Sequence, residues 1–115
     1  MSWDIILMKT GNEFDLPLEQ CFGEKCYSLD TKKCIELLKS EYPTLDYSDP
    51  TWIILESRRL AFEMQIVNKE QIVLHMRLSK KKEVKHLLNL LTNGLQCGAF
   101  DTTSDEWIIP PFSKL

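Results

Sequence analysis

The chain has 115 residues, 43% of them hydrophobic, which is enough to bury the core of one domain, residues 1–115, and leaves no room for a second. Its formal net charge is −3. Proteins that bind nucleic acids or anionic membranes concentrate lysine and arginine instead, so we expect neither as a direct partner.

The amino-terminal stretch has the features of neither an export signal nor a membrane-spanning helix. Asp4 lies at the start of a short apolar run, and no basic residue precedes it. We therefore expect a cytoplasmic protein. In that compartment Cys21, Cys26, Cys34 and Cys97 are expected to be free thiols.

Residues 3–8 predict a first strand, and its alternating side chains are mostly apolar on both faces, as is typical of a strand inside a sheet. Residues 13–29 follow without a sustained period and contain Pro17 and Gly23, which indicates a long loop. Loops of this length are usually functional or mobile. The hydrophobic residues of this loop indicate that it is held over one end of the core.

A helix is predicted from an N-cap at Asp30 or Thr31 to about Glu41. Its apolar stripe, spaced to lie on a sheet, consists of Cys34, Ile35, Leu38 and Tyr42. The composition of residues 45–50 predicts a turn, because aspartate and serine side chains can bond to their own backbone. Residues 52–56 then predict a second strand.

Residues 60–67 and 71–78 are two period-two runs separated by a short polar break, and they predict a β-hairpin. A three-residue turn at 68–70 would pair Phe62 with Met76 and keep the apolar side chains on one face. A two-residue turn would mix the two faces. The sequence therefore favours the three-residue turn.

Ser79 predicts the N-cap of a second helix, and Asn93-Gly94 signals its end. Its apolar positions, spaced at one helical face, are Val84, Leu87, Leu88 and Leu91. The lysines at 80–82 and at Lys85 are typical of a solvated helix face rather than of a nucleic-acid contact.

A short strand at 95–100 and a last extended piece at 107–109 complete the chain. The order β-α-β-β-β-α-β predicts an α+β fold, in which two helices pack on one face of a mostly antiparallel sheet of about five strands. The opposite face would remain open to solvent or to a partner, and its polar residues would be Glu63, Gln65, His75 and Arg77.

No motif in the sequence specifies a reaction. Cys21 and Cys26 have the spacing of a loose metal knuckle that His75, His86 or Cys34 could complete, but zinc sites usually offer a second tight pair. Phosphate-binding loops, nucleotide fingerprints and protease motifs do not occur in it. We expect no metal, no cofactor and no catalytic activity. A thiol or metal enzyme that uses Cys21 and Cys26 remains an alternative.

Three segments mix acidic with aromatic residues and are the candidate partner-binding sites. Carboxylates attract a basic partner over long range, and aromatic side chains supply desolvated anchors at interfaces. The candidate residues are Glu13, Asp15, Glu19, Glu24, Tyr27, Asp46, Tyr47, Asp49, Asp105, Glu106 and Trp107.

Four stretches of the sequence carry a resemblance to a known family. They are the opening MSWDII, the Tyr-Pro at the end of the first helix with the following DYSDPTW, the LHMR of the hairpin, and the closing FDTTSDEW. Together they resemble a family of small cytosolic bacterial proteins, some of which are immunity proteins of polymorphic-toxin and contact-dependent growth-inhibition systems. The resemblance covers nearly the whole chain, and the loop with Cys21 and Cys26 departs from the family's compact pattern.

The resemblance implies a protein that binds the toxic C-terminal domain of a cognate effector, often a nuclease, and blocks its active site or substrate groove. The alternative is a non-catalytic adaptor or structural protein that homodimerises through its open sheet face, around Gln65, Val73 and His75. We expect a monomer or a weak homodimer.

Overall fold

The computed structural model describes residues 3–10, 26–77 and 79–109. These residues form an α+β fold, as the sequence predicts. The elements in chain order are β1 (Trp3–Thr10), β2 (Cys26–Tyr27), α1 (Thr31–Glu41), β3 (Asp46–Asp49), β4 (Trp52–Glu56), β5 (Ala61–Asn68), β6 (Gln71–Met76), α2 (Lys81–Leu95), β7 (Gly98–Asp101) and β8 (Glu106–Ile109). No helix within these ranges combines the length and the apolar character needed to cross a membrane.

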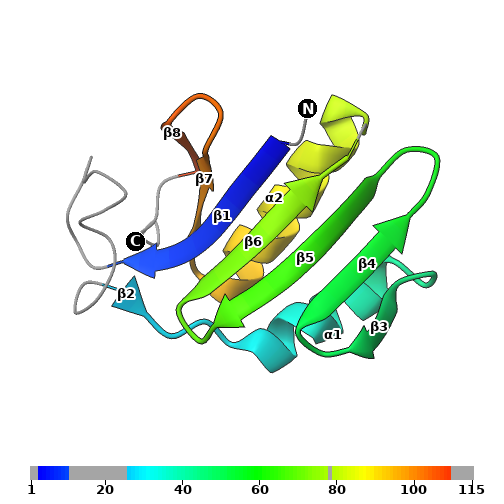
Figure 1. Ribbon diagram of the computed structural model, residues 1–115, viewed down its shortest axis with the longest axis horizontal. Coiled ribbons are helices and arrows are strands. Elements are labelled where there is room, and N and C mark those ends of the chain that lie inside the picture. The colour runs from blue at the N-terminus through cyan, green and yellow to red at the C-terminus, as the bar shows by residue number, and fades with distance from the viewer. Residues whose placement is uncertain (1–2, 11–25, 78, 110–115) are drawn as a thin grey trace.

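The sheet is antiparallel throughout and runs in the order β3-β4-β5-β6-β1-β7-β8, while the short β2 pairs with the end of β1 (Figure 1). Strand β1 lies between β6 and β7, which confirms the predicted internal position. The two strands beyond the predicted five on this path are β3 and β8. Each of them forms one edge of the sheet.

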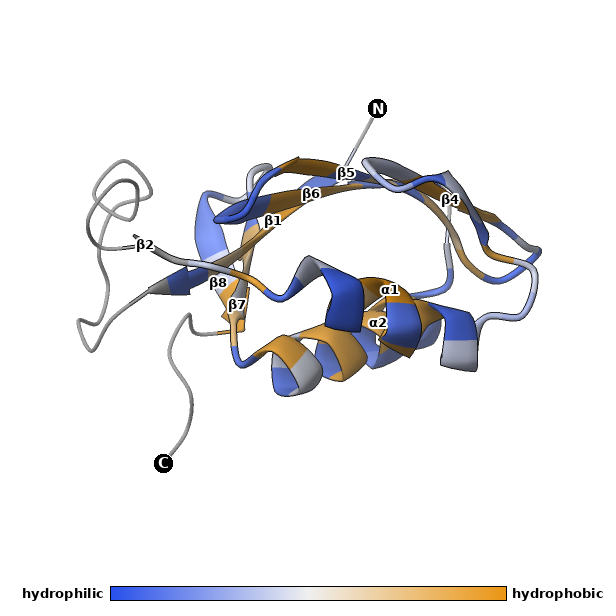
Figure 2. Cartoon of the chain, turned by 90° about the horizontal axis from the view of Figure 1, so that it is seen from below, coloured by the Kyte–Doolittle hydropathy of each residue, from blue (hydrophilic) through white to orange (hydrophobic). Residues whose placement is uncertain are grey.

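Both helices cover the same face of the sheet, and the sheet curves around them so that they lie on its concave side (Figure 2). The main core lies between these two layers. Phe62, Met64 and Leu74 are fully buried there, and Met76 is nearly so. The face that the sequence predicts to be apolar is therefore the face beneath the helices.

The hairpin of β5 and β6 has the predicted register, in which Phe62 pairs with Met76 and Glu63 with His75. The predicted three-residue turn is wrong, because Asn68 pairs directly with Gln71 and the register shifts between Ile66 and Asn68. The Asn68 side chain accepts a hydrogen bond from the backbone N–H of Glu70 at 2.8 Å, which closes a shorter turn. A bulge at Val67 takes up the extra residue and keeps the faces unmixed.

Strand β3 occupies the segment predicted as a turn. Asp46 pairs with Ile54 and Asp49 pairs with Trp52, with a shift of register between them. The predicted local bonds do form, since Asp46 accepts from the Ser48 N–H at 3.1 Å and Asp49 from the Thr51 N–H at 2.9 Å. These bonds leave the backbone of β3 free to pair with β4. The segment is therefore an edge strand that also contains the side-chain-to-backbone bonds typical of turns.

Helix α1 begins as predicted, with the Asp30 side chain accepting a hydrogen bond from the Lys33 N–H at 3.0 Å. The predicted N-cap of α2 is wrong, because Lys80 occupies that position without a side-chain cap. The Ser79 hydroxyl instead bonds to the Ala61 N–H at 3.0 Å and to the Arg77 carbonyl at 3.0 Å. Ser79 therefore links the start of β5 to the residue that follows β6, before α2 begins.

The predicted end of α2 at Asn93-Gly94 is also wrong, since the helix continues to Leu95. Gly94 lies inside the helix, where a Cβ would come within 2.3 Å of Leu37 Cδ1. The glycine thus permits a close approach of α1 to α2 rather than a turn. Gln96 ends the helix in the left-handed conformation, with φ 55° and ψ 50°.

Replacing Gln96 with glycine is expected to stabilise the fold by about 1 kcal/mol, because a residue without a Cβ adopts this conformation without strain. The Gln96 side chain donates to the Asn93 carbonyl at 2.7 Å, and loss of this exposed bond offsets only part of the gain. Urea unfolding measures the change. The matched control is Asn93→Gly within the helix, which should lower stability. A loss of stability in Gln96→Gly would contradict the assignment.

Candidate functional site

The convex face of the sheet, which no helix covers, is assembled by residues from all seven strands of the main path. Residues that pair directly across antiparallel strands point to the same face. One row across this face consists of Asp49, Trp52, Gln65, Val73, Ile6, Phe100 and Trp107. A second row consists of Asp46, Ile54, Glu63, His75 and Asp4. We call this surface the open face.

His75 lies at the centre of the open face and has a neighbour on each side. Its Nδ1 is 2.9 Å from Asp4 Oδ1, and its Nε2 is 3.4 Å from Gln65 Oε1. The Trp52 indole stacks on the imidazole, with ring centroids 5.8 Å apart and an interplanar angle of 23°. The sequence predicts His75 beside Glu63, and the pairing confirms it, but the direct ring contacts are with the other three residues.

Glu63 links the same tryptophan to Arg77. Its Oε1 accepts from Trp52 Nε1 at 3.1 Å, and its Oε2 accepts from Arg77 Nη2 at 2.6 Å. The hydrogen bond from Arg77, and then that from Trp52, lowers the pKa of Glu63, and Glu63 in turn raises the pKa of Arg77. The half-buried Trp52 is thus held by a stacking contact with His75 and a hydrogen bond to Glu63.

A small apolar cluster lies at the end of the open face formed by β1, β7 and β8. Ile6, Met8 and Phe100 are buried there, and Val73 and Trp107 pack against them. The rings of Phe100 and Trp107 meet edge to face, with centroids 5.1 Å apart. Trp107, which the sequence singles out for partner binding, therefore packs against the sheet with much of its surface.

The β3 edge of the open face carries two fixed carboxylates. Hydrogen bonds from the Ser48 backbone and hydroxyl lower the pKa of Asp46, and the equivalent bonds from Thr51 lower the pKa of Asp49. Tyr47 lies between them in the sequence and is 45% exposed. The Nζ of Lys39 in α1 lies over its ring, 4.8 Å from the ring centroid. Tyr47 thus faces the helices, whereas the two aspartates belong to the open face.

The remaining predicted partner-binding residues do not join this group. Asp105, in the turn between β7 and β8, and Glu106, the first residue of β8, are exposed at the far end of the sheet from β3. Tyr27 lies in β2, which pairs with Lys9 and Thr10. Four further predictions, Glu13, Asp15, Glu19 and Glu24, lie outside the described residues, as does Cys21.

Charge is segregated between the two sides of the fold. Among the described residues, the open face carries five carboxylates, Asp4, Asp46, Asp49, Glu56 and Glu63, and one permanent cation, Arg77. The helices carry six lysines, Lys32, Lys33, Lys39, Lys81, Lys82 and Lys85, and three glutamates, Glu36, Glu41 and Glu83. Between these two sets of described residues, the net negative charge therefore lies on the open face and the net positive charge on the helices.

Two buried thiols are structural. Cys34 and Cys97 are buried and unpaired with each other, and burial raises the pKa of each to about 12. Neither has the exposed, electropositive surroundings of a nucleophilic cysteine. No group of three or more histidine, cysteine or acidic side chains suited to a metal ion occurs in residues 3–10, 26–77 and 79–109.

Sequence reasoning identifies Glu63, Gln65, His75 and Arg77 on this face but misses the roles of Trp52 and Asp4. Strand alternation is the signal that could have found them. Trp52 and Ile54 alternate with the buried Ile53 and Leu55 and so must point away from the core.

Comparisons of the chain with protein-family models, with curated proteins and with solved structures find no match. The family that the sequence motifs resemble therefore remains a prediction. The open face, with its fixed tryptophan and its excess of carboxylates, is the feature from which a function is best argued.

The hydrogen bonds to Asp46 and Asp49 predict that two substitutions will each change the pKa of one aspartate only, which an NMR titration of the carboxyl groups can measure. Hydrogen bonds favour the ionised aspartates, so they stabilise the fold above the ordinary aspartate pKa of about 3.9. This contribution disappears as the pH falls through the lowered folded-state values. Ser48→Ala should raise the pKa of Asp46 part of the way back and leave Asp49 unchanged, while Thr51→Val should do the reverse. If either substitution raised the pKa of both aspartates, the claim that each pKa is set by its own neighbouring hydroxyl would be contradicted.

Proposed function

We propose that this chain is an immunity protein, which binds a cognate bacterial toxin domain in the cytoplasm and neutralises it by blocking the active site or substrate groove. The single observation that carries the proposal is the acidic, convex open face on which Trp52 is held by His75 and Glu63. The sequence resemblance supplies the class of partner. The chain acts by binding and not by catalysis.

Shape and charge support a groove as the target. A convex surface can enter a concave one, and the helices on the other side leave the open face uncovered (Figure 2). A nuclease binds its polyanionic substrate in a basic groove. Five carboxylates on the entering surface would attract such a groove over long range and speed association. A nuclease domain is therefore the favoured toxin.

The fixed tryptophan supports affinity once contact is made. Tryptophan and arginine are enriched among residues that dominate binding energy. Trp52 is held by His75 and Glu63, and Arg77 is held by Glu63, so neither side chain loses much rotational freedom on binding. Such preorganisation lowers the entropic cost of association.

The same face carries half-buried apolar side chains, Ile54 and Val73, and these favour the alternative of a homodimer. A two-fold contact through this face would bring identical sets of carboxylates together, and like charges across an interface are destabilising. Sedimentation velocity over a range of concentrations separates the two candidates. A dimer that Val73→Glu abolishes would favour the adaptor, whereas a monomer at all concentrations would exclude it.

The proposal is tested by calorimetric titration of the chain with the toxin domain encoded immediately upstream of its gene. Asp46→Lys combined with Asp49→Lys should weaken binding by on the order of tenfold to a hundredfold at low salt, and by less at high salt. The matched control is Glu36→Lys with Glu41→Lys, which makes the same change of charge on α1, away from the open face.

Equal weakening by the two double variants would show that net charge, and not the open face, drives association. Trp52→Ala adds a salt-independent test, and it should reduce affinity by about 2 kcal/mol or more if this side chain is an anchor. Absence of binding by the unaltered chain would overturn the proposed function.

A further inference from the structure

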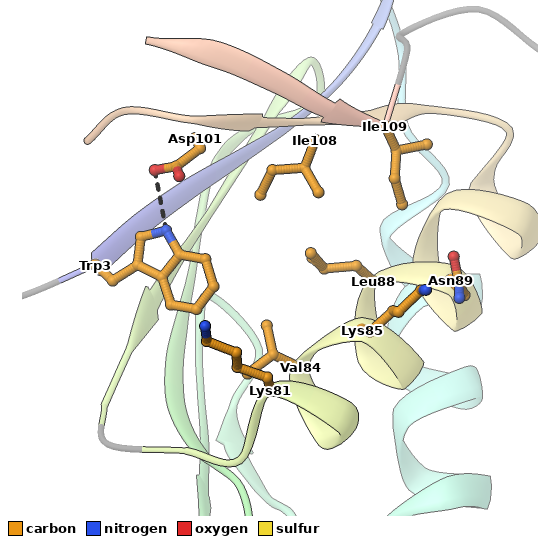
Figure 3. Close-up of a pocket in the computed structure, with 9 residues that line it drawn as sticks. All are labelled: Trp3, Lys81, Val84, Lys85, Leu88, Asn89, Asp101, Ile108 and Ile109. Carbon is orange, nitrogen blue, oxygen red and sulfur yellow. Dashed lines mark hydrogen bonds between the residues drawn. The ribbon is translucent and has the colours of Figure 1, made fainter. Parts of the chain in front are cut away.

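A separate pocket lies on the other side of the sheet, between the first half of α2 and the strands β1, β7 and β8 (Figure 3). Its volume is about 350 Å³, at the lower end of the range of small-molecule sites, which is about 300–1,000 Å³. Val84 and Leu88 form the α2 side, and Trp3, Ile108 and Ile109 form the strand side. An apolar ligand body of modest size would fill it.

The strand side of the pocket is held in place by hydrogen bonds. Trp3 Nε1 donates to Asp101 Oδ1 at 2.9 Å, and the same oxygen accepts from the Thr103 N–H at 2.9 Å. This pair orients the indole so that its ring forms one wall (Figure 3). Ile108 is 42% exposed, which is unusual for a large apolar side chain in this fold. The Trp3 part of the wall is therefore fixed in orientation, and the Ile108 part is left partly open to solvent.

The polar groups at the rim carry a net positive charge. Lys81 and Lys85 are one turn apart on α2 and both line the pocket, together with the neutral Asn89. Asp101 is the only carboxylate among the lining residues, and its Oδ1 is already engaged by two donors. Among the described residues, no carboxylate forms a salt bridge with either lysine.

From this geometry we propose that the pocket binds a small amphiphilic anion, a medium-chain alkyl carboxylate, with its tail between Leu88 and Trp3 and its head at Lys81 and Lys85. Apolar walls with a few polar groups at one side are the general form of such sites. The Lys81 side chain points toward Trp3 and the Lys85 side chain toward Asn89 (Figure 3). Either ammonium group can pair with the carboxylate, and the charge of both favours an anion. The site lies apart from the open face, so the proposal is independent of the toxin-binding function.

The experiment is a titration of ¹⁵N-labelled protein with octanoate, followed at the Trp3 indole N–H resonance, which Trp3→Phe assigns. Octanoate should shift this resonance saturably and leave the Trp52 indole unchanged. Neutral octanol should bind more weakly, and cationic octylammonium more weakly still. Equal affinity for octanol and octanoate would contradict the proposed preference for an anion. If the Trp3 resonance showed no saturable shift, the proposed site would be wrong.

Two pairs of lysine substitutions distinguish the effect of the lysines at the pocket rim from the effect of net charge. Lys81→Glu combined with Lys85→Glu should weaken octanoate binding by about tenfold. The matched control is Lys80→Glu with Lys82→Glu, which changes charge equally at the same end of α2 but alters no lining residue. Equal effects of the two pairs would contradict a localised head group. Ile108→Glu, at an exposed position, should also weaken binding without unfolding the protein, and unchanged affinity would remove Ile108 from the site.

Discussion

The register of the β5–β6 hairpin determines which side chains make the core and which make the open face. Because side chains alternate along a strand, a slip by one residue would exchange the two sets completely. The bulge at Val67 prevents this exchange, since it absorbs one residue and keeps Phe62 opposite Met76. Core packing and surface chemistry therefore depend on the same local feature. Neither can be altered there without altering the other.

The pairing of strands also explains how distant parts of the chain come together at the open face. Asp4 lies near the start of the sequence and His75 lies 71 residues later, yet β1 and β6 place them within hydrogen-bonding distance. The curvature of the sheet around the helices then makes this face convex (Figure 2). The carboxylates of this face therefore lie on a convex surface that neither helix covers.

Much of the fold can be predicted from the sequence because it follows from periodicity. The internal strand β1, helix α1, strand β4 and the hairpin faces each arise from an apolar pattern of the right period, and each is confirmed. The errors occur where two local preferences compete. Ser79 can cap a helix but bonds to strand backbone instead, and Gly94 can end a helix but serves the contact with Leu37. Such choices depend on neighbours that are distant in sequence.

The candidate site is only partly predictable for a related reason. Alternation places Glu63, His75 and Arg77 on the uncovered face, but the stacking of Trp52 on His75 depends on two pairings at once, β4 with β5 and β5 with β6. The sequence predicts the acidic residues of β3 as turn residues with a binding role, and only the fold shows that they share a face with Trp52. Tyr47, from the same short segment, faces α1 and its Lys39 instead.

Strand β3 is an edge strand, and its outer backbone groups are a template to which another strand could add. Its four residues are all exposed, and two of them are aspartates whose ionised form is favoured by local hydrogen bonds. A second copy approaching edge to edge would meet like charges, and the shift of register in β3 further disturbs regular pairing. The same two carboxylates that would meet the proposed basic partner thus also protect the sheet from aggregating with copies of itself.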